Sequence, residues 1–288
     1  MIIMYKKELR QLFGNVRSFA VIGILLLSCG IYTVFQNLLS ASPDFSLALT
    51  GMLPFLTVTL PILSVGAFST ERKCGTQGWL YSLSLRSSDV VLGKYFALLS
   101  VFSIPMIVIA IYPLILSFFG MMEMEKSYFA WFGMLLLGAA LLSLCLFLSL
   151  FFRNVWAIWA VGSAALLSLY LIQLFLTVLP AAGWFSLLII ELFLIGICVF
   201  FLFVIRSKIT AICFSSLPVA SAILFAVKPD LFVSLVAKIF AGVNPFSRFA
   251  GFIYGRFDLQ GILFYISFIV IFLFATVKIT ECRRDSEI

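Results

Sequence analysis

The chain has 288 residues, of which 64% are hydrophobic and only 11% are charged, and its net charge is +7. So much apolar surface exceeds what one soluble core can bury, which excludes an ordinary water-soluble domain. The chain contains no histidine, so the usual histidine-based zinc, haem and nucleophilic-triad sites are excluded as well. The composition therefore predicts an all-α integral membrane protein.

Residues 1–18 predict a helix that lies on the membrane surface and leads into the first span. Between Tyr5 and Arg17, basic and apolar residues alternate at helical spacing: Lys6, Lys7 and Arg10 with Leu9, Leu12 and Phe13. Such a helix places its apolar side chains at the acyl boundary and its cations among anionic headgroups. We therefore expect membrane lipid as one partner of this segment.

Eight apolar runs of roughly 20 residues are long enough to cross a bilayer as helices. They fall at residues 19–39, 48–68, 95–119, 129–152, 155–179, 184–205, 209–227 and 262–278. The first run follows a basic start, as a signal peptide would, but its length favours a retained span. The chain is therefore predicted to be one transmembrane domain over residues 1–288, with spans 1 and 2 in 19–68, spans 3 to 5 in 95–179, a hairpin in 184–227 and a tail at 279–288.

The basic residues predict the orientation of these spans, because short loops rich in Lys and Arg stay on the cytoplasmic side. With the N-terminus inside, fourteen of the nineteen basic residues lie on the inner side. The five on the outer side are Lys126, Lys228, Lys238, Arg248 and Arg256. Both termini are therefore expected in the cytoplasm, and the protein in the cell membrane. The asymmetry also accounts for the net charge without a nucleic-acid partner.

Residues 69–94, called here the polar segment, separate spans 2 and 3 on the predicted inner side. Gly75 permits a turn, and Thr76 can cap a short helix that contains Trp79 and Leu80. A second helix is expected to begin with Ser87 or Ser88 as its N-cap, to carry Asp89 in its first turn and to continue through Lys94. On pattern alone, the first helix either binds a cytosolic partner or rests on lipid headgroups with Trp79 at the interface.

Residues 229–261 form the other polar-flanked segment of interest, on the predicted outer side. Apolar residues recur at helical spacing on both sides of Asn244 and Pro245, which predicts two short helices dipping into the outer leaflet. The second helix carries Phe246, Phe249 and Phe252, with Arg248 between them.

Glu191 is the one ionisable residue expected in the middle of a span. An intramembrane carboxylate is costly, so it is a candidate for binding substrate or protons. The alternative is a protonated Glu191 that bonds to a neighbouring helix. The run Met121–Glu125 offers three thioethers, but an ordinary helix end is favoured over a copper site. No metal site is therefore predicted.

The polar segment carries residues that resemble a known signature. The run Glu71-Arg72-Lys73-Cys74-Gly75-Thr76, with Leu80, Ser87 and then Val90-Val91-Leu92-Gly93-Lys94, is similar to the motif after the second span of type-2 ABC exporter permeases, closest to the gliding-motility and copper-maturation type. A second stretch, Asn244-Pro245-Phe246-Ser247-Arg248-Phe249 followed by Gly255 and Asp258-Leu259, also resembles that family. The hairpin at 184–227 is additional to the family's six-span core.

The resemblance implies a dimer of permeases, identical or sibling, seated on two separate ATP-binding subunits. It implies ATPase coupling through Glu71, Arg72, Gly75, Thr76, Trp79, Leu80, Gly93 and Lys94, and a surface elbow helix at the N-terminus that also touches the ATPase. It further implies a re-entrant outer helix, so Phe246, Arg248, Phe249 and Phe252 are candidates for an outer gate, with a packing cap as the alternative.

The sequence has no phosphate-binding loop of the form GxxxxGK[ST] and no catalytic cluster, so ATP and Mg would bind the partner subunit and not this chain. The expected function is export of a hydrophobic or amphipathic substrate, such as a peptide. The alternative is a secondary transporter or channel that uses Glu191, which would normally show more buried polar residues and an internal repeat.

Overall fold

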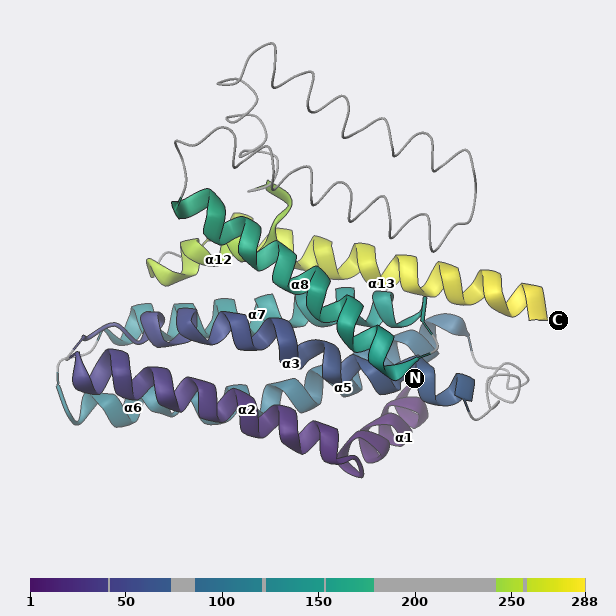
Figure 1. Ribbon diagram of the computed structural model, residues 1–288, viewed down its shortest axis with the longest axis horizontal. Helices are drawn as coiled ribbons and strands as arrows, with labels where there is room; N and C mark the ends of the chain where they lie inside the picture. Colours follow the sequence, from purple (N-terminus) through teal and green to yellow (C-terminus); the bar gives the residue numbers. More distant parts are fainter. Residues whose placement is uncertain are drawn as a thin grey trace, which may run out of the picture. The chain divides into compact units, whose positions relative to one another are not determined.

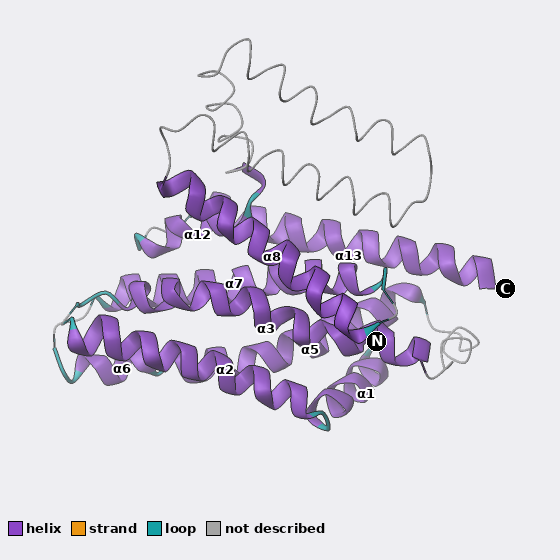
Figure 2. Ribbon diagram, in the orientation of Figure 1, coloured by secondary structure: helices purple, strands orange, loops and turns teal. Residues whose placement is uncertain are grey.

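The computed structural model describes residues 1–40, 42–73, 86–120, 123–152, 154–178, 242–255 and 258–287. All regular structure in these ranges is helical, as the sequence predicts (Figure 2). The chain divides into two compact units, and each is described by itself. The first comprises Met1–Leu167 with Arg248–Ile288, and the second comprises Ser168–Ser247.

The chain begins with two helices, which correspond to the predicted surface helix and the first predicted span. Helix α1 covers Ile2–Phe13 and α2 covers Val16–Thr33, with a π-helical extension η1 over Val34–Leu39. Asn15 is extended, with φ −109° and ψ 126°, so the helical backbone is interrupted before α2. The predicted surface helix is therefore shorter than expected, and the first span begins three residues earlier, at Val16.

Two long helices extend into the polar segment from its two sides. Helix α3 covers Phe45–Lys73 and α5 covers Ser87–Ile109. The predicted capping of α5 by Ser87 or Ser88 is wrong. Arg86 occupies the N-cap, with extended backbone and no side-chain capping bond, and Ser87 is already inside the helix. Asp89 does lie in the first turn, as predicted, where its charge favours the positive end of the helix dipole.

The third predicted span is broken near its C-terminal end. Helix α5 ends at Ile109, and a short helix α6 covers Tyr112–Ser117 with Pro113 in its first turn. Proline lacks the backbone N–H that a continuous helix requires, but it fits the start of a new helix, where that donor has no partner. Helix α7 then covers Met124–Ser149.

The remaining described helices are α8 over Val155–Val178, α12 over Pro245–Ile253 and α13 over Leu259–Glu287. Within the described ranges, six helical segments are long and apolar enough to cross a membrane: Val16–Leu39, Phe45–Ser69, Ser87–Ser117, Met124–Ser149, Val155–Leu174 and Leu259–Arg284. They correspond to six of the eight predicted runs. The other two, at 184–205 and 209–227, lie outside the described residues.

Helices α3 and α7 form the centre of the first unit. Helix α3 packs against α2 and α7, and α7 also packs against α5 and α13. Most buried side chains of these helices are aliphatic or aromatic, and the hydroxyls of Thr57, Ser64 and Ser143 donate to carbonyls of their own helices. Such back-bonding satisfies hydroxyl groups that would otherwise be unpaired in an apolar interior.

Four parts of the chain that are distant in sequence gather at one end of this unit. The N-terminus, the end of α3, the start of α5 and the C-terminus lie at the same end in Figure 1. One hydrogen bond connects two spans there: Arg283 Nη1 donates to the carbonyl of Leu150 over 2.7 Å, joining the end of α13 to the end of α7. Both termini on one side agree with an even number of spans.

Candidate functional site

The structure describes only part of the predicted coupling set. Thr70–Lys73 form the last turn of α3, which places the backbone of Glu71 and Arg72, while nothing is described of their side chains. Gly75, Thr76, Trp79 and Leu80 lie outside the described residues. Gly93 and Lys94 are fully described on α5, and they show how the polar segment is anchored.

Lys94 lies at the meeting point of three helices. Its Nζ donates to Oε1 of Glu8 on α1 over 2.9 Å and to the carbonyl of Ala67 on α3 over 2.6 Å. It also lies 5.2 Å from the ring centroid of Phe68, within the range of a cation–π contact. Lys94 is 1% exposed and Glu8 is 5% exposed, so this is a buried ion pair.

The burial of Lys94 limits the coupling role that the resemblance implies for it. A side chain in this position contacts its own protein and not a partner surface. Its ammonium has a carboxylate, a backbone carbonyl and an aromatic face around it, which compensates for the loss of water. Lys94 therefore holds α1, α3 and α5 together at the end of the polar segment.

Gly93 permits the close approach of α1 on which this ion pair depends. A Cβ added at Gly93 would lie 3.1 Å from Cβ of Met4 and 3.3 Å from the backbone nitrogen of Tyr5. Further along α5, the hydroxyl of Ser100 lies 2.9 Å from the hydroxyl of Tyr5. The small residue and the two polar contacts together dock α1 along the start of α5.

The sequence prediction missed Glu8. The available signal was that Glu8 is the one acidic residue in a segment otherwise rich in lysine and arginine, and that it stands four residues from Met4, on the same helical face. Both residues are buried in the structure. Nothing in the local pattern indicated that the partner of Glu8 would be Lys94, 86 residues away.

The predicted outer gate residues are buried. Exposure is 3% at Phe246, 1% at Phe249 and 0% at Phe252. In the second unit, Phe246 packs edge-on against Tyr170, with ring centroids 5.6 Å apart, and the amide of Phe246 donates to Oδ1 of Asn244 over 3.0 Å. Asn244 thereby caps the start of α12, directly before Pro245, as helix N-termini favour.

In the first unit, Phe252 fills a space left by two glycines on neighbouring helices. A Cβ at Gly133 of α7 would lie 2.6 Å from Cβ of Phe252, and a Cβ at Gly261 of α13 would lie 2.9 Å from its ring. Phe252 therefore packs against both of these helices. This packing favours the cap over the gate for Phe252, and the gating role of the three phenylalanines remains a prediction.

Arg248 places a cation beside the packed phenylalanines of α12. Its guanidinium carbon lies 5.7 Å from the ring centroid of Phe264 on α13. Its Nε is buried and has no hydrogen-bond partner among the residues that the structure describes. Nearby, Gly255 adopts φ +69°, a left-handed conformation that favours glycine, and thereby ends α12 close to Lys126 of α7.

Replacing Gly133 with alanine tests this packing. We expect a loss of about 1–3 kcal/mol in unfolding free energy, because the added methyl group overlaps Phe252 and the helices must move apart. Gly23→Ala is the matched control, since a Cβ at Gly23 meets nothing within 4 Å. Thermal unfolding of both variants in detergent gives the comparison, and equal stability of the two would contradict a fixed position for Phe252.

The starts of α3 and α7 are joined by a second ion pair. Lys126 Nζ donates to both carboxylate oxygens of Asp44, over 2.8 Å and 2.7 Å, and lies 3.4 Å from a carboxylate oxygen of Glu123. These groups are partly exposed, unlike Lys94 and Glu8. Met121 and Met122, which the alternative copper site would use, lie outside the described residues, as does Glu191.

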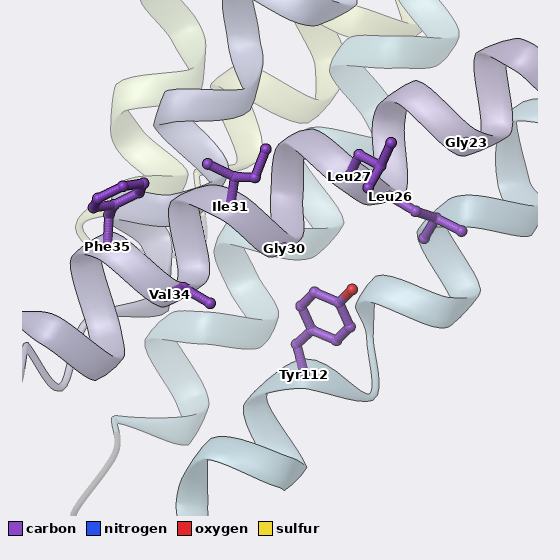
Figure 3. A pocket seen from close by; sticks show the side chains of 8 residues that line it. All are labelled: Gly23, Leu26, Leu27, Gly30, Ile31, Val34, Phe35 and Tyr112. Atoms are coloured by element: carbon purple, nitrogen blue, oxygen red, sulfur yellow. The ribbon is translucent and has the colours of Figure 1, made fainter.

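An apolar groove of about 600 Å³ runs between α2 and α6. Its lining is Gly23, Leu26, Leu27, Gly30, Ile31, Val34 and Phe35 of α2 and η1, with Tyr112 of α6. Figure 3 shows Tyr112 across the groove from the α2 side chains. The shape and apolar lining suit a lipid chain or the face of another helix, and they assign no substrate.

Six long apolar helices, with polar ends and buried backbone-bonded hydroxyls, define a multi-pass helical membrane protein. Comparison with known proteins adds no narrower class: no family model, no curated protein and no solved structure matches the chain.

Proposed function

We propose that this chain is the transmembrane permease subunit of an ATP-driven exporter of the type-2 ABC class. In this proposal a dimer of permeases, identical or sibling, sits on two copies of an ATP-binding subunit, which bind ATP and Mg. The substrate moved outward is hydrophobic or amphipathic, such as a peptide. The proposal rests on the resemblance of the polar segment and of the stretch that begins at Asn244 to that family.

One structural observation supports it above others. The two spans that flank the polar segment are tied to each other and to α1 at a single buried point, formed by Lys94, Glu8 and the carbonyl of Ala67. A partner that moves the polar segment would therefore move α1, α3 and α5 together. Such rigid transmission is what a motor subunit outside the membrane requires to change the arrangement of spans.

The charge distribution supports a cytoplasmic position for the polar segment. The end of the first unit that carries the N-terminus and the start of α5 also carries Lys6, Arg10, Arg17 and Arg86, all exposed. Among the described residues, fewer basic side chains lie at the opposite end, and Lys126 there is paired with Asp44. Under the positive-inside rule, the basic end faces the cytoplasm, where ATP is available.

This orientation is testable with thiol labelling. Cys282 is exposed near the end of α13, and Gly120 lies in open space after α6. In a background where the other exposed or undescribed cysteines are serine, we expect a membrane-impermeant maleimide to label a Gly120→Cys variant in intact cells. It should label Cys282 only after the membrane is opened. The reverse pattern would contradict the orientation and with it the access of the polar segment to ATP-binding subunits.

The direct test is purification of this chain from its native membrane in mild detergent, with identification of bound proteins and an assay of ATP hydrolysis. We expect an ATP-binding subunit in equal amount, with ATPase activity, and either one or two kinds of permease. A chain that purifies alone without activity would overturn the proposal and favour a secondary transporter, with Glu191 as the first residue to replace.

A further inference from the structure

Helix α1 has a buried face that is fixed and an opposite face that is exposed. Met4 and Glu8 are buried, and both contact α5, where Met4 lies beside Gly93 and Glu8 bonds to Lys94. On the other side Ile2 is 70% exposed, Ile3 is 84% exposed and Phe13 is 37% exposed. Lys6 and Arg10 are also exposed. The exposed face therefore has apolar residues near both ends of the helix and two cations between them.

The two cations lie one helical turn apart. At a spacing of four residues, Lys6 and Arg10 are neighbours on the helix surface, where like charges repel each other. The one carboxylate in α1 belongs to Glu8, and it is 5% exposed and bound to Lys94. The buried ion pair thus removes from this surface the only acidic group of α1 that could compensate Lys6 and Arg10.

The position of α1 brings this face to the membrane surface. Helix α1 leaves the line of the membrane-spanning α2 at Gly14 and Asn15 (Figure 1). At the start of α2, Val16 is 80% exposed and Phe19 is 57% exposed, and Arg17 is exposed between them. A helix at the end of a span, with exposed apolar and basic residues, lies at the depth of lipid headgroups.

We propose that the exposed face of α1 is a binding surface for anionic phospholipid, with a headgroup phosphate held between Lys6 and Arg10 and a contribution from Arg17. Ile2, Ile3 and Phe13 enter the acyl boundary while the longer basic side chains reach the phosphates. The Glu8–Lys94 pair fixes this face outward and connects it to α3 and α5. Lipid binding here does not depend on the proposed ATP-driven function.

A protein occupant fits this face less well. Interface cores are depleted in lysine, and two like charges one turn apart would have to be buried together with exposed isoleucines. Anionic lipids satisfy both features at once, because phosphates lie directly above an apolar layer. Each lysine or arginine near such a surface adds about 1 kcal/mol of attraction, or about five-fold in affinity.

The test is native mass spectrometry of the detergent-purified full chain, with phosphatidylglycerol or phosphatidylcholine of the same acyl chains added. We expect tighter binding of phosphatidylglycerol, and a loss of about five-fold in its affinity for each cation removed in a Lys6→Gln, Arg10→Gln variant. A charge-conserving Lys6→Arg, Arg10→Lys variant should keep the preference. It also controls for folding, together with the gel-filtration profile.

Lys278→Gln with Arg284→Gln is the matched control, because it removes two positive charges from α13 near the C-terminal end. Its preference for phosphatidylglycerol should remain close to that of the unaltered protein. Equal binding of the two lipids by the unaltered protein would overturn the proposal. So would an equal loss in the α1 and α13 variants, which would indicate general charge attraction with no surface on α1.

Discussion

Replacing Lys94 with methionine is expected to lower the unfolding free energy by about 3–5 kcal/mol, because Glu8 is left as a buried carboxylate without its partner. The methionine retains an apolar chain of similar length, so the loss reports the missing charge more than a cavity. The ammonium also bonds the carbonyl of Ala67, and that contact is lost too. Thermal or denaturant unfolding of the purified protein measures the effect.

The pair between Lys126 and Asp44 provides a control on the same kind of substitution. Its side chains are 24% and 26% exposed, so water screens the charges that remain after one partner is removed. Lys126→Met is therefore expected to cost no more than about 1 kcal/mol. A cost for Lys94→Met as small as that for Lys126→Met would contradict the burial of Lys94.

A double replacement separates the charge from the packing. In Glu8→Met with Lys94→Met, neither charge remains, and apolar side chains fill similar space. Such replacements of buried ion pairs are often neutral or stabilising, so we expect most of the stability lost in Lys94→Met to return. The double-mutant cycle then gives the coupling between the two residues directly. If the losses simply add, Glu8 and Lys94 do not interact as the structure indicates.

The six described spans were predictable from sequence because their signal is local. A run of about 20 apolar residues is enough to identify a bilayer-crossing helix, whatever it packs against. The break between α5 and α6 was less visible, since Pro105 lies inside α5 without ending it while Pro113 starts α6. Prolines are tolerated inside membrane helices when neighbouring groups satisfy the freed carbonyl, so the sequence alone does not decide between the two outcomes.

The contacts of the candidate site were not predictable in the same way. Helical spacing correctly indicated that Phe249 and Phe252 share an apolar face, but not that Phe252 would fit between Gly133 and Gly261. Likewise, Lys94 is recognisable in the sequence as a polar residue, while its partner Glu8 lies 86 residues earlier in the sequence. Both contacts depend on which helices become neighbours. That arrangement follows from packing over the whole unit, so a local sequence pattern does not indicate it.

Replacing Trp79 with alanine is expected to weaken binding of the ATP-binding subunit by about 2 kcal/mol or more, or roughly 30-fold. In the proposed complex Trp79 and Leu80 are the buried anchor of the coupling helix, and tryptophan is the side chain whose removal commonly costs most at such an interface. The affinity of purified permease for the subunit identified by co-purification gives the measurement, and stimulation of ATP hydrolysis should fall with it.

Trp156 offers a control that resolves the alternative for Trp79. It is 72% exposed at the start of α8, outside the polar segment, where a tryptophan serves as an interfacial belt residue. Trp156→Ala should leave subunit binding unchanged. If Trp79→Ala behaves like Trp156→Ala in both binding and ATPase stimulation, the helix at Trp79 rests on lipid headgroups. The connection of α3 and α5 through Lys94 would then hold a membrane-surface element in place. It would not transmit movement from an ATP-binding subunit.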